Sequence, residues 1–259
     1  MNSMSKPFLF KELPGSVPNN IPLSHRDDHD EKHAYFAEMM ESMIQILCEN
    51  AKQKPCSVLE LGAGTGIFTK RLSRLPNVQV TAVEMGTETH ARLLLNIGSS
   101  KSVEVLKDDC LKLDLHKQFD FVVSSFAAHT IQEGQKEQYF YVVRRHLKKD
   151  GLFIVGDEFL RDYDSTNKEE RFEALKDYHH HIIEIARGEN ELILLELEST
   201  ALLSGLLELG DFKVSTEIYE RLLEKAGFAV QKKKIGPRAL PDIGGVYVFT
   251  SLQRMKEVE

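Results

Sequence analysis

SVLELGAGTGIFTK, residues 57–70, is the stretch that decides the fold. An apolar run ends at Glu60 and Leu61, and glycines then occupy alternate positions at Gly62, Gly64 and Gly66. Glycines at this spacing predict a tight turn between a buried strand and a helix, in which the backbone passes very close to a ligand.

The spacing of the turn also indicates the kind of ligand. A dinucleotide site has the pattern G-x-G-x-x-G, whereas here the third glycine comes one position early and Ile67 stands in its place. Glu60 suits a cationic amine better than a phosphate. Glu84 ends the next apolar run and is placed to accept hydrogen bonds from ribose hydroxyls. S-adenosylmethionine has an amine and a ribose but no phosphate, so a nicotinamide oxidoreductase is disfavoured.

Composition and charge restrict the class of protein. The 259 residues suffice for one large α/β domain with a small addition, and 42% of them are hydrophobic. The net charge is −7 with scattered basic residues, which makes nucleic acid an unlikely partner. Three cysteines (Cys48, Cys56 and Cys110) suit a reducing compartment. No segment is typical of a signal peptide or a membrane span, so we expect a cytoplasmic protein without membrane contact.

Short apolar runs alternate with helical patterns along the chain. Strands are expected at 57–61, 78–84, 102–106, 119–125 and 151–158, and helices at 66–75, 87–95 and 134–147. This alternation predicts a doubly wound, Rossmann-like parallel sheet. After a helix at 215–226, the strands at 228–235 and 245–252 are too close in sequence for a helical crossover. The predicted fold is therefore α/β, with a seven-stranded sheet of five parallel strands plus a C-terminal antiparallel hairpin.

Two regions fall outside this alternation. Residues 1–54 form an N-terminal segment with an amphipathic helix at 31–51, which we expect to act as a lid. Residues 160–210 form a helical insertion between the two parts of the sheet domain, 55–159 and 211–253. Because the insertion leaves the sheet at the carboxyl end of a parallel strand, where open α/β sheets bind ligands, we expect a cap over the acceptor. Simple packing or homodimerisation is the alternative.

Five segments in order resemble the class I S-adenosylmethionine-dependent methyltransferases that act on small molecules. They are VLELGAGTG (58–66), AVEMG (82–86), KDDC (107–110), FDFVVSSFAAHTI (119–131) and LKKDGLFIVGDE (147–158). The resemblance covers about residues 57–252 outside the insertion, and KDDC departs from the family's usual Gly-Asp-Ala. It implies S-adenosylmethionine as cofactor and methyl transfer to an oxygen, nitrogen or carbon nucleophile of a small molecule.

The resemblance also implies which residues hold the cofactor. The backbone of the glycine turn would approach the methionine moiety, with Glu60 near its amine, and Glu84 would hold the ribose. Adenine would lie against Met85, with Asp109 and the backbone of Cys110 reading its edge. Ser124 and Phe126 would line the pocket near the sulfonium. The whole predicted set is Glu60, Gly62, Ala63, Gly64, Gly66, Glu84, Met85, Asp109, Cys110, Ser124 and Phe126.

Catalysis and acceptor binding are less determined by the sequence. His129 follows the fourth strand and is a candidate general base, although a histidine in such a loop is equally often a packing residue. The lid and the insertion supply the candidate acceptor residues His29, His33, Phe36, Asp157, Glu158, Tyr178 and His179. The Asn-Pro-Pro-Tyr type of segment found in relatives that methylate adenine or glutamine is absent, which favours a small molecule. A non-catalytic cofactor-binding scaffold or partner subunit is the alternative.

Two groups of histidines raise the possibility of a metal site. His25, His29 and His33 recur every four residues, and residues 179–181 are three consecutive histidines. Consecutive residues of a helix point in different directions, and no Cys or Glu pattern completes either group. The sequence therefore predicts no metal site.

Overall fold

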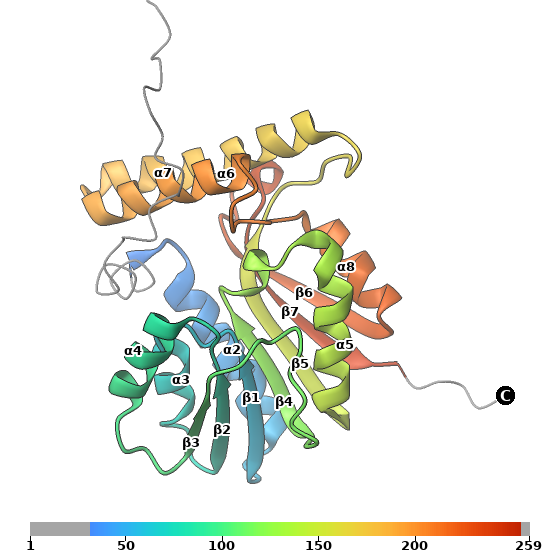
Figure 1. The fold of residues 1–259 in the computed structure, drawn as a ribbon. Helices are drawn as coiled ribbons and strands as arrows, with labels where there is room; N and C mark the ends of the chain where they lie inside the picture. The colour runs from blue at the N-terminus through green and yellow to red at the C-terminus, as the bar shows by residue number, and fades with distance from the viewer. Residues whose placement is uncertain (1–31, 255–259) are drawn as a thin grey trace, which may run out of the picture.

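The computed structural model describes residues 32–254, which form a seven-stranded sheet with helices on both faces (Figure 1). The strand order is β3-β2-β1-β4-β5-β7-β6. Strands β1 to β5 pair in parallel, and β7 is antiparallel to both β5 and β6. The predicted fold class is confirmed. The strands are β1 Cys56–Leu61, β2 Val78–Val83, β3 Val103–Leu106, β4 Phe119–Ser125, β5 Leu147–Phe159, β6 Phe228–Gly236 and β7 Gly245–Gln253.

One strand is longer than its apolar pattern indicates. β5 begins at Leu147 rather than at residue 151, because Leu147 pairs with Phe119 of β4 before an irregularity in the register between Phe119 and Phe121. The intervening residues 148–150 are exposed and charged, so they carry no apolar signal. From residue 151 onward β5 is buried throughout, as expected of a central strand.

Two groups of helices cover the two faces of the sheet. One hydrophobic cluster joins the sheet to α2, α3 and α4, and another joins it to α5 and α8. The α6–α7 pair has a hydrophobic core of its own. The helices are α2 Phe36–Ala51, α3 Ile67–Leu72, α4 Thr87–Ile97, α5 Lys136–His146, α6 Lys168–Gly188, α7 Leu192–Leu206 and α8 Thr216–Lys225.

Helix α2 lies directly against the middle of the sheet. At Gly156 of β5, a Cβ atom would stand 2.5 Å from Met43 Sδ and 2.7 Å from Met39 Sδ. Both methionines are fully buried, so a side chain at position 156 would have to displace the methionine side chains of α2. This close approach brings the N-terminal end of α2, with Phe36, to the carboxyl end of β5.

The insertion forms the α6–α7 pair, which lies across the edge of the sheet where the parallel strands end (Figure 1). An apolar stripe on α6 faces this core, with Leu175 and Ile182 fully buried and Phe172 and Ile185 at its border. A bridge between Leu160 and Ser215 joins the two ends of the insertion. None of the helices within residues 32–254 is both long and apolar enough to cross a lipid bilayer.

Candidate active site

The glycine turn joins β1 to α3 and has the backbone conformation that its sequence predicts. Gly62, Gly64 and Gly66 have φ angles of 74°, 57° and 92°, in the left-handed region that favours glycine. A Cβ atom at Gly62 would lie 2.6 Å from Ala127 Cβ, whereas one at Gly64 would meet no atom within 4 Å. The intervening Ala63 is buried and donates its N–H to Val83 O of β2. The turn is therefore fixed on the protein side and open to a ligand at Gly64.

Glu84 follows β2 and organises this turn. Its Oε2 accepts from Gly64 N at 2.9 Å, and its Oε1 accepts from Gly86 N at 2.7 Å and Thr89 Oγ1 at 2.7 Å. The side chain thus joins the glycine turn to the start of α4. Each carboxylate oxygen offers about two lone pairs, so Oε2 retains acceptor capacity for a ribose hydroxyl.

Glu60 is a buried acid near the end of β1. Its residue is 1% exposed, and Thr69 Oγ1 donates to Oε2 at 2.6 Å. Burial raises the pKa of Glu60 to about 8. The charge of Glu84 also raises this pKa, whereas the hydrogen bond from Thr69 lowers it. No lysine, arginine or histidine within residues 32–254 offsets this buried acid. A cationic ligand amine would supply that charge, so the residue fits the role that the resemblance implies.

The residues expected around adenine lie on the loops after β2 and β3. Met85 is 65% exposed, so its side chain is free to pack on a planar ring. Asp109 is engaged by its own loop, since Oδ1 accepts from Leu111 N at 2.9 Å and Oδ2 lies 3.0 Å from Lys112 Nζ. Its pKa is lowered because these partners outweigh the opposing effect of burial. Cys110 is half-buried beside the core, and burial raises the pKa of its thiol to about 11.

Phe126, expected near the sulfonium, contacts three other aromatic rings. Its φ is 49°, a conformation that strains a bulky residue by about 1–3 kcal/mol and is typical of functional sites. Its ring lies 4.7 Å from Phe36 and 5.1 Å from His33 between centroids, and 6.3 Å from His129. Ser124, two residues earlier on β4, is buried. Phe126 thus separates the N-terminal helix from the loop after β4.

His129 and Asp157 form a hydrogen-bonded pair at the carboxyl ends of β4 and β5. His129 Nδ1 lies 2.7 Å from Asp157 Oδ1, and its backbone N donates to Oδ2 at 2.9 Å. Burial lowers the pKa of His129, but Asp157 outweighs that effect and raises it above 6.5. Because the carboxylate accepts at Nδ1, the neutral ring has its lone pair on Nε2. Its side chain is 16% exposed, so the ring remains accessible. The sequence predicted both residues but not their contact.

A buried lysine fixes the loop that carries His129, and sequence reasoning missed it. Lys136 begins α5 and is 1% exposed. Its Nζ donates to the carbonyls of Ala128 and Ile131, each at 2.8 Å. Burial lowers the pKa of Lys136 to about 8. In the sequence, a lysine in the polar first turn of a helix is expected to be exposed to solvent. Only the tertiary structure shows that Lys136 is buried and binds the His129 loop.

The remaining candidate acceptor residues meet in a buried ionic cluster beneath the α6–α7 pair. His33 Nε2 lies 3.0 Å from Glu158 Oε1, and Tyr178 Oη donates to the same oxygen at 2.6 Å. His179 Nδ1 lies 2.8 Å from Glu198 Oε2. The structure thus brings His33, Glu158, Tyr178 and His179 together, whereas His29 lies outside the described residues.

Three members of this cluster were not predicted from the sequence. Glu198 lies on the buried side of α7, and Asp211 and Lys213 lie in the segment that returns to the sheet. Lys213 Nζ is 3.0 Å from Glu158 Oε2 and 2.5 Å from Asp211 Oδ2. Burial alone would raise the pKa of the Asp211 carboxyl, but Lys213 and the nearby histidines lower it. Glu198 stands in an almost entirely apolar helix, which is the signal that could have revealed it.

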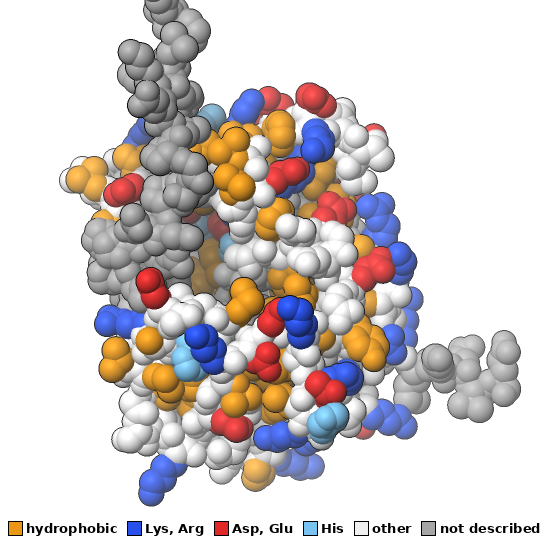
Figure 2. Space-filling view, viewed as in Figure 1, with side chains coloured by type: hydrophobic (Ala, Val, Ile, Leu, Met, Phe, Trp, Pro, Cys, Tyr) orange, Lys and Arg blue, Asp and Glu red, His pale blue; other side chains and the backbone are white. Residues whose placement is uncertain are grey.

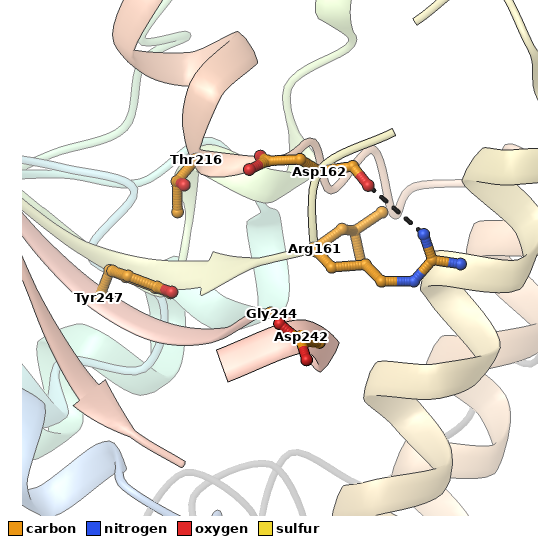
Figure 3. Close-up of a pocket in the computed structure, with 7 residues that line it drawn as sticks. Arg161, Asp162, Thr216, Asp242, Gly244 and Tyr247 are labelled. Carbon is orange, nitrogen blue, oxygen red and sulfur yellow. Dashed lines mark hydrogen bonds between the residues drawn. The ribbon is translucent and has the colours of Figure 1, made fainter. Parts of the chain in front are cut away.

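A cavity of about 240 Å³ opens between the end of β5, the start of α8 and β7 (Figure 3). Arg161 Nη1 donates to the carbonyl of Asp162 at its edge, and Tyr247 forms part of its wall. None of its lining residues belongs to the glycine turn or the His129 loop. On the face seen in Figure 2, the surface is recessed between the α6–α7 layer and the sheet layer beneath it.

Comparisons with known proteins agree with this geometry. Residues 58–151 match the profile of a family described as a methyltransferase domain. An uncharacterized methyltransferase of Oceanobacillus iheyensis is 30% identical over 129 residues, which cover 49% of this chain and 58% of that protein. The chain thus spans about 58% of the length of this curated relative.

Solved structures show the same fold at low sequence identity. One is the 1,6-didemethyltoxoflavin-N1-methyltransferase of Burkholderia thailandensis, 17% identical with a TM-score of 0.56, over 90% of this chain and 84% of that one. Another is the CurJ carbon methyltransferase, 14% identical with a TM-score of 0.63, over 91% of this chain and 60% of that one. The predicted resemblance is confirmed: residues 58–151 are similar to a methyltransferase domain, and the fold is that of solved methyltransferases, one of them in complex with S-adenosyl-L-methionine.

Proposed function

We propose that the protein transfers a methyl group from S-adenosylmethionine to an oxygen, nitrogen or carbon nucleophile of a small molecule, with His129 as general base. The observation that carries the proposal is the hydrogen bond of 2.7 Å between His129 Nδ1 and Asp157 Oδ1. It holds a basic ring nitrogen at the carboxyl end of β4, beside Phe126 and the glycine turn.

The chain's own residues would bind and orient the two reactants. The cofactor, when bound, supplies a methyl group already activated by the sulfonium. Glu60 would pair with its amine, Glu84 Oε2 would accept from its ribose, and Met85 would cover its adenine. The protein's remaining task is to place the nucleophile in line and to remove its proton. His129 Nε2 would take that proton, and Asp157 would stabilise the resulting imidazolium.

The acceptor would lie between the His129 loop and the cap. Phe36 and Phe126 offer an apolar wall, and the ionic cluster beneath α6 lies behind it. A solved methyltransferase of the same fold has 1,6-didemethyltoxoflavin and S-adenosylhomocysteine bound. The cap would exclude water and supply acceptor specificity, while the loops of the sheet hold the cofactor.

The proposal is tested in two steps, because a non-catalytic scaffold would also bind the cofactor. First, S-adenosylhomocysteine should raise the melting temperature of the protein and NAD should not. Second, the protein should transfer a labelled methyl group from S-adenosylmethionine into a metabolite extract. Absence of labelling with intact cofactor binding would favour the scaffold.

Matched variants then test the role of His129. His129→Gln should lower kcat by about 10²–10⁴-fold, the usual contribution of a general base, with cofactor affinity unchanged. His180→Gln is the control, because His180 is exposed on α6. Equal rates in the two variants would remove His129 from the mechanism.

A further inference from the structure

The buried ionic cluster beneath the cap joins parts of the chain that are distant in sequence. His33 precedes α2, Glu158 ends β5, His179 lies on α6 and Glu198 lies on α7. The cluster also contains Asp211 and Lys213, and each of these six residues is at most 5% exposed. Charged groups buried this completely require compensation within the protein.

Three atoms of the cluster converge from different elements. His33 Nε2 lies 3.0 Å from Glu158 Oε1 and 3.2 Å from Glu198 Oε1. One potential ligand atom from each of the three residues lies within 4.8 Å of the other two. Two ligands bound to one ion at about 2.1 Å, at angles between octahedral and tetrahedral, are about 3.0–3.4 Å apart. The spacing around His33 therefore matches that of adjacent ligands on one metal ion.

Each of the three side chains is also oriented by a partner on its other side. His33 Nδ1 lies 2.7 Å from Ala34 O, which fixes the tautomer that leaves Nε2 facing the carboxylates. His179 Nδ1 contacts Glu198 Oε2 at 2.8 Å, and Lys213 Nζ contacts Glu158 Oε2 at 3.0 Å. Outer partners of this kind, a carbonyl behind a histidine and donors behind carboxylates, surround metal ligands in proteins.

The charges of the cluster leave room for a divalent cation. Glu158, Glu198 and Asp211 carry three negative charges when ionised, and Lys213 supplies one positive charge. Counted over the described residues of the cluster alone, two further positive charges are needed for neutrality. Protonation of both His33 and His179 would provide them, and so would one divalent ion bound by a neutral His33.

We propose that His33 Nε2, Glu158 Oε1 and Glu198 Oε1 bind a divalent first-row transition-metal ion such as Zn²⁺, Mn²⁺ or Fe²⁺. One imidazole and two carboxylates suit these ions, whereas Ca²⁺ and Mg²⁺ favour oxygen ligands alone. The ion is structural: it ties the N-terminal segment, the sheet and the cap together at one point. It also fixes β5 next to Asp157, the partner of His129.

The proposal departs from the expectation drawn from the sequence. In the sequence, His33 recurs at four-residue spacing with His25 and His29, and His179 is the first of three consecutive histidines. Neither pattern predicts a metal site. In the fold, His33 instead meets two glutamates from other elements. The proposal is independent of the methyl-transfer reaction and is tested without measuring activity.

The experiment uses the full chain, stripped of metal with a chelator and titrated with Co²⁺ at neutral pH. Wild-type protein should bind one Co²⁺ per chain, with visible d–d absorption bands and a raised melting temperature. Zn²⁺ should displace the Co²⁺, and protein as purified should contain about one metal ion per chain by mass spectrometry.

Two variants of α7 locate the ion. Glu198→Gln should weaken Co²⁺ binding by at least about 100-fold, because loss of a ligand exceeds the 10–100-fold effect of losing an outer partner. Glu196→Gln is the matched control, since Glu196 is exposed on the same helix and should bind as wild type. Thermal stabilisation by S-adenosylhomocysteine shows that each variant is folded.

Three results would overturn the proposal. One is wild-type protein that shows no saturable binding of Co²⁺ or Zn²⁺ below about 100 μM. Another is Glu198→Gln binding as tightly as Glu196→Gln. The third is an NMR spectrum of Zn²⁺-treated protein in which both ring nitrogens of His33 carry protons, because an imidazolium cannot be a ligand.

Discussion

Binding of the cofactor is expected to drive a proton off Glu60. This carboxyl is buried with one hydrogen bond, from Thr69, and its pKa is raised to about 8 chiefly by burial. At pH 7 an acid of pKa about 8 is about 90% protonated, and at pH 8 it is about half protonated. The cationic amine of S-adenosylhomocysteine would favour the ionised form. Binding should therefore release about 0.9 proton per chain at pH 7 and about 0.5 at pH 8.

Isothermal titration calorimetry measures this release directly. The heat of binding is recorded at each pH in buffers of different ionisation enthalpy, and its slope gives the number of protons released. Glu60→Gln keeps the shape of the side chain and an acceptor for Thr69 Oγ1 but cannot titrate. The variant should release no proton, and its affinity should fall about 10–100-fold, because a hydrogen bond to a charged group contributes about 1.5–3 kcal/mol.

Glu88→Gln removes an exposed carboxylate in the first turn of α4 and should behave as wild type. If wild-type protein releases no proton at pH 7 and Glu60→Gln retains full affinity, Glu60 does not face the amine. The assignment of the β1 end to the methionine moiety would then be wrong.

The same geometry supports five further predictions. Glu84→Ala should weaken S-adenosylhomocysteine binding by about 1–3 kcal/mol in calorimetry, and unchanged affinity would remove Glu84 from the site. Asp157 raises the pKa of His129 above 6.5, so kcat/KM should rise with pH through an apparent pKa above 6.5; a flat profile from pH 6 to 9 would contradict a base at this position. The stability that this pair contributes should be complete below pH 6.5 and lost as the pH rises through the folded-state pKa, as measured by urea unfolding. Lys136→Met should lower the free energy of unfolding by about 1–3 kcal/mol and lower kcat, because the carbonyls of Ala128 and Ile131 lose their donor. An unchanged melting temperature would show that Lys136 does not fix the His129 loop. Replacing 162–210 by a Gly-Ser linker should spare cofactor binding and abolish turnover, and a linker variant with full turnover would refute the cap.

The sequence by itself determined the sheet and the cofactor turn. Each parallel strand is a short apolar run of its own, so burial on both faces is visible in the residue types, as in FDFVVSS at 119–125. The turn is equally local, because left-handed φ angles at Gly62, Gly64 and Gly66 follow from the absence of side chains. Neighbouring residues also determine where α8 begins, because Ser215 Oγ accepts a hydrogen bond from Ile218 N at 3.3 Å and so caps the helix.

Only the tertiary structure decided which polar residues meet. His129 and Asp157 each appeared in the sequence as separate candidates, and the parallel pairing of β4 with β5 makes them a dyad. Lys136 carried no local signal, because the sequence does not distinguish a buried lysine from an exposed one. His33 and Glu198 lie 165 residues apart in the chain yet 3.2 Å apart in space. Their contact depends on how α2 and the cap pack on the sheet, and this packing is set by many apolar contacts that no short motif records.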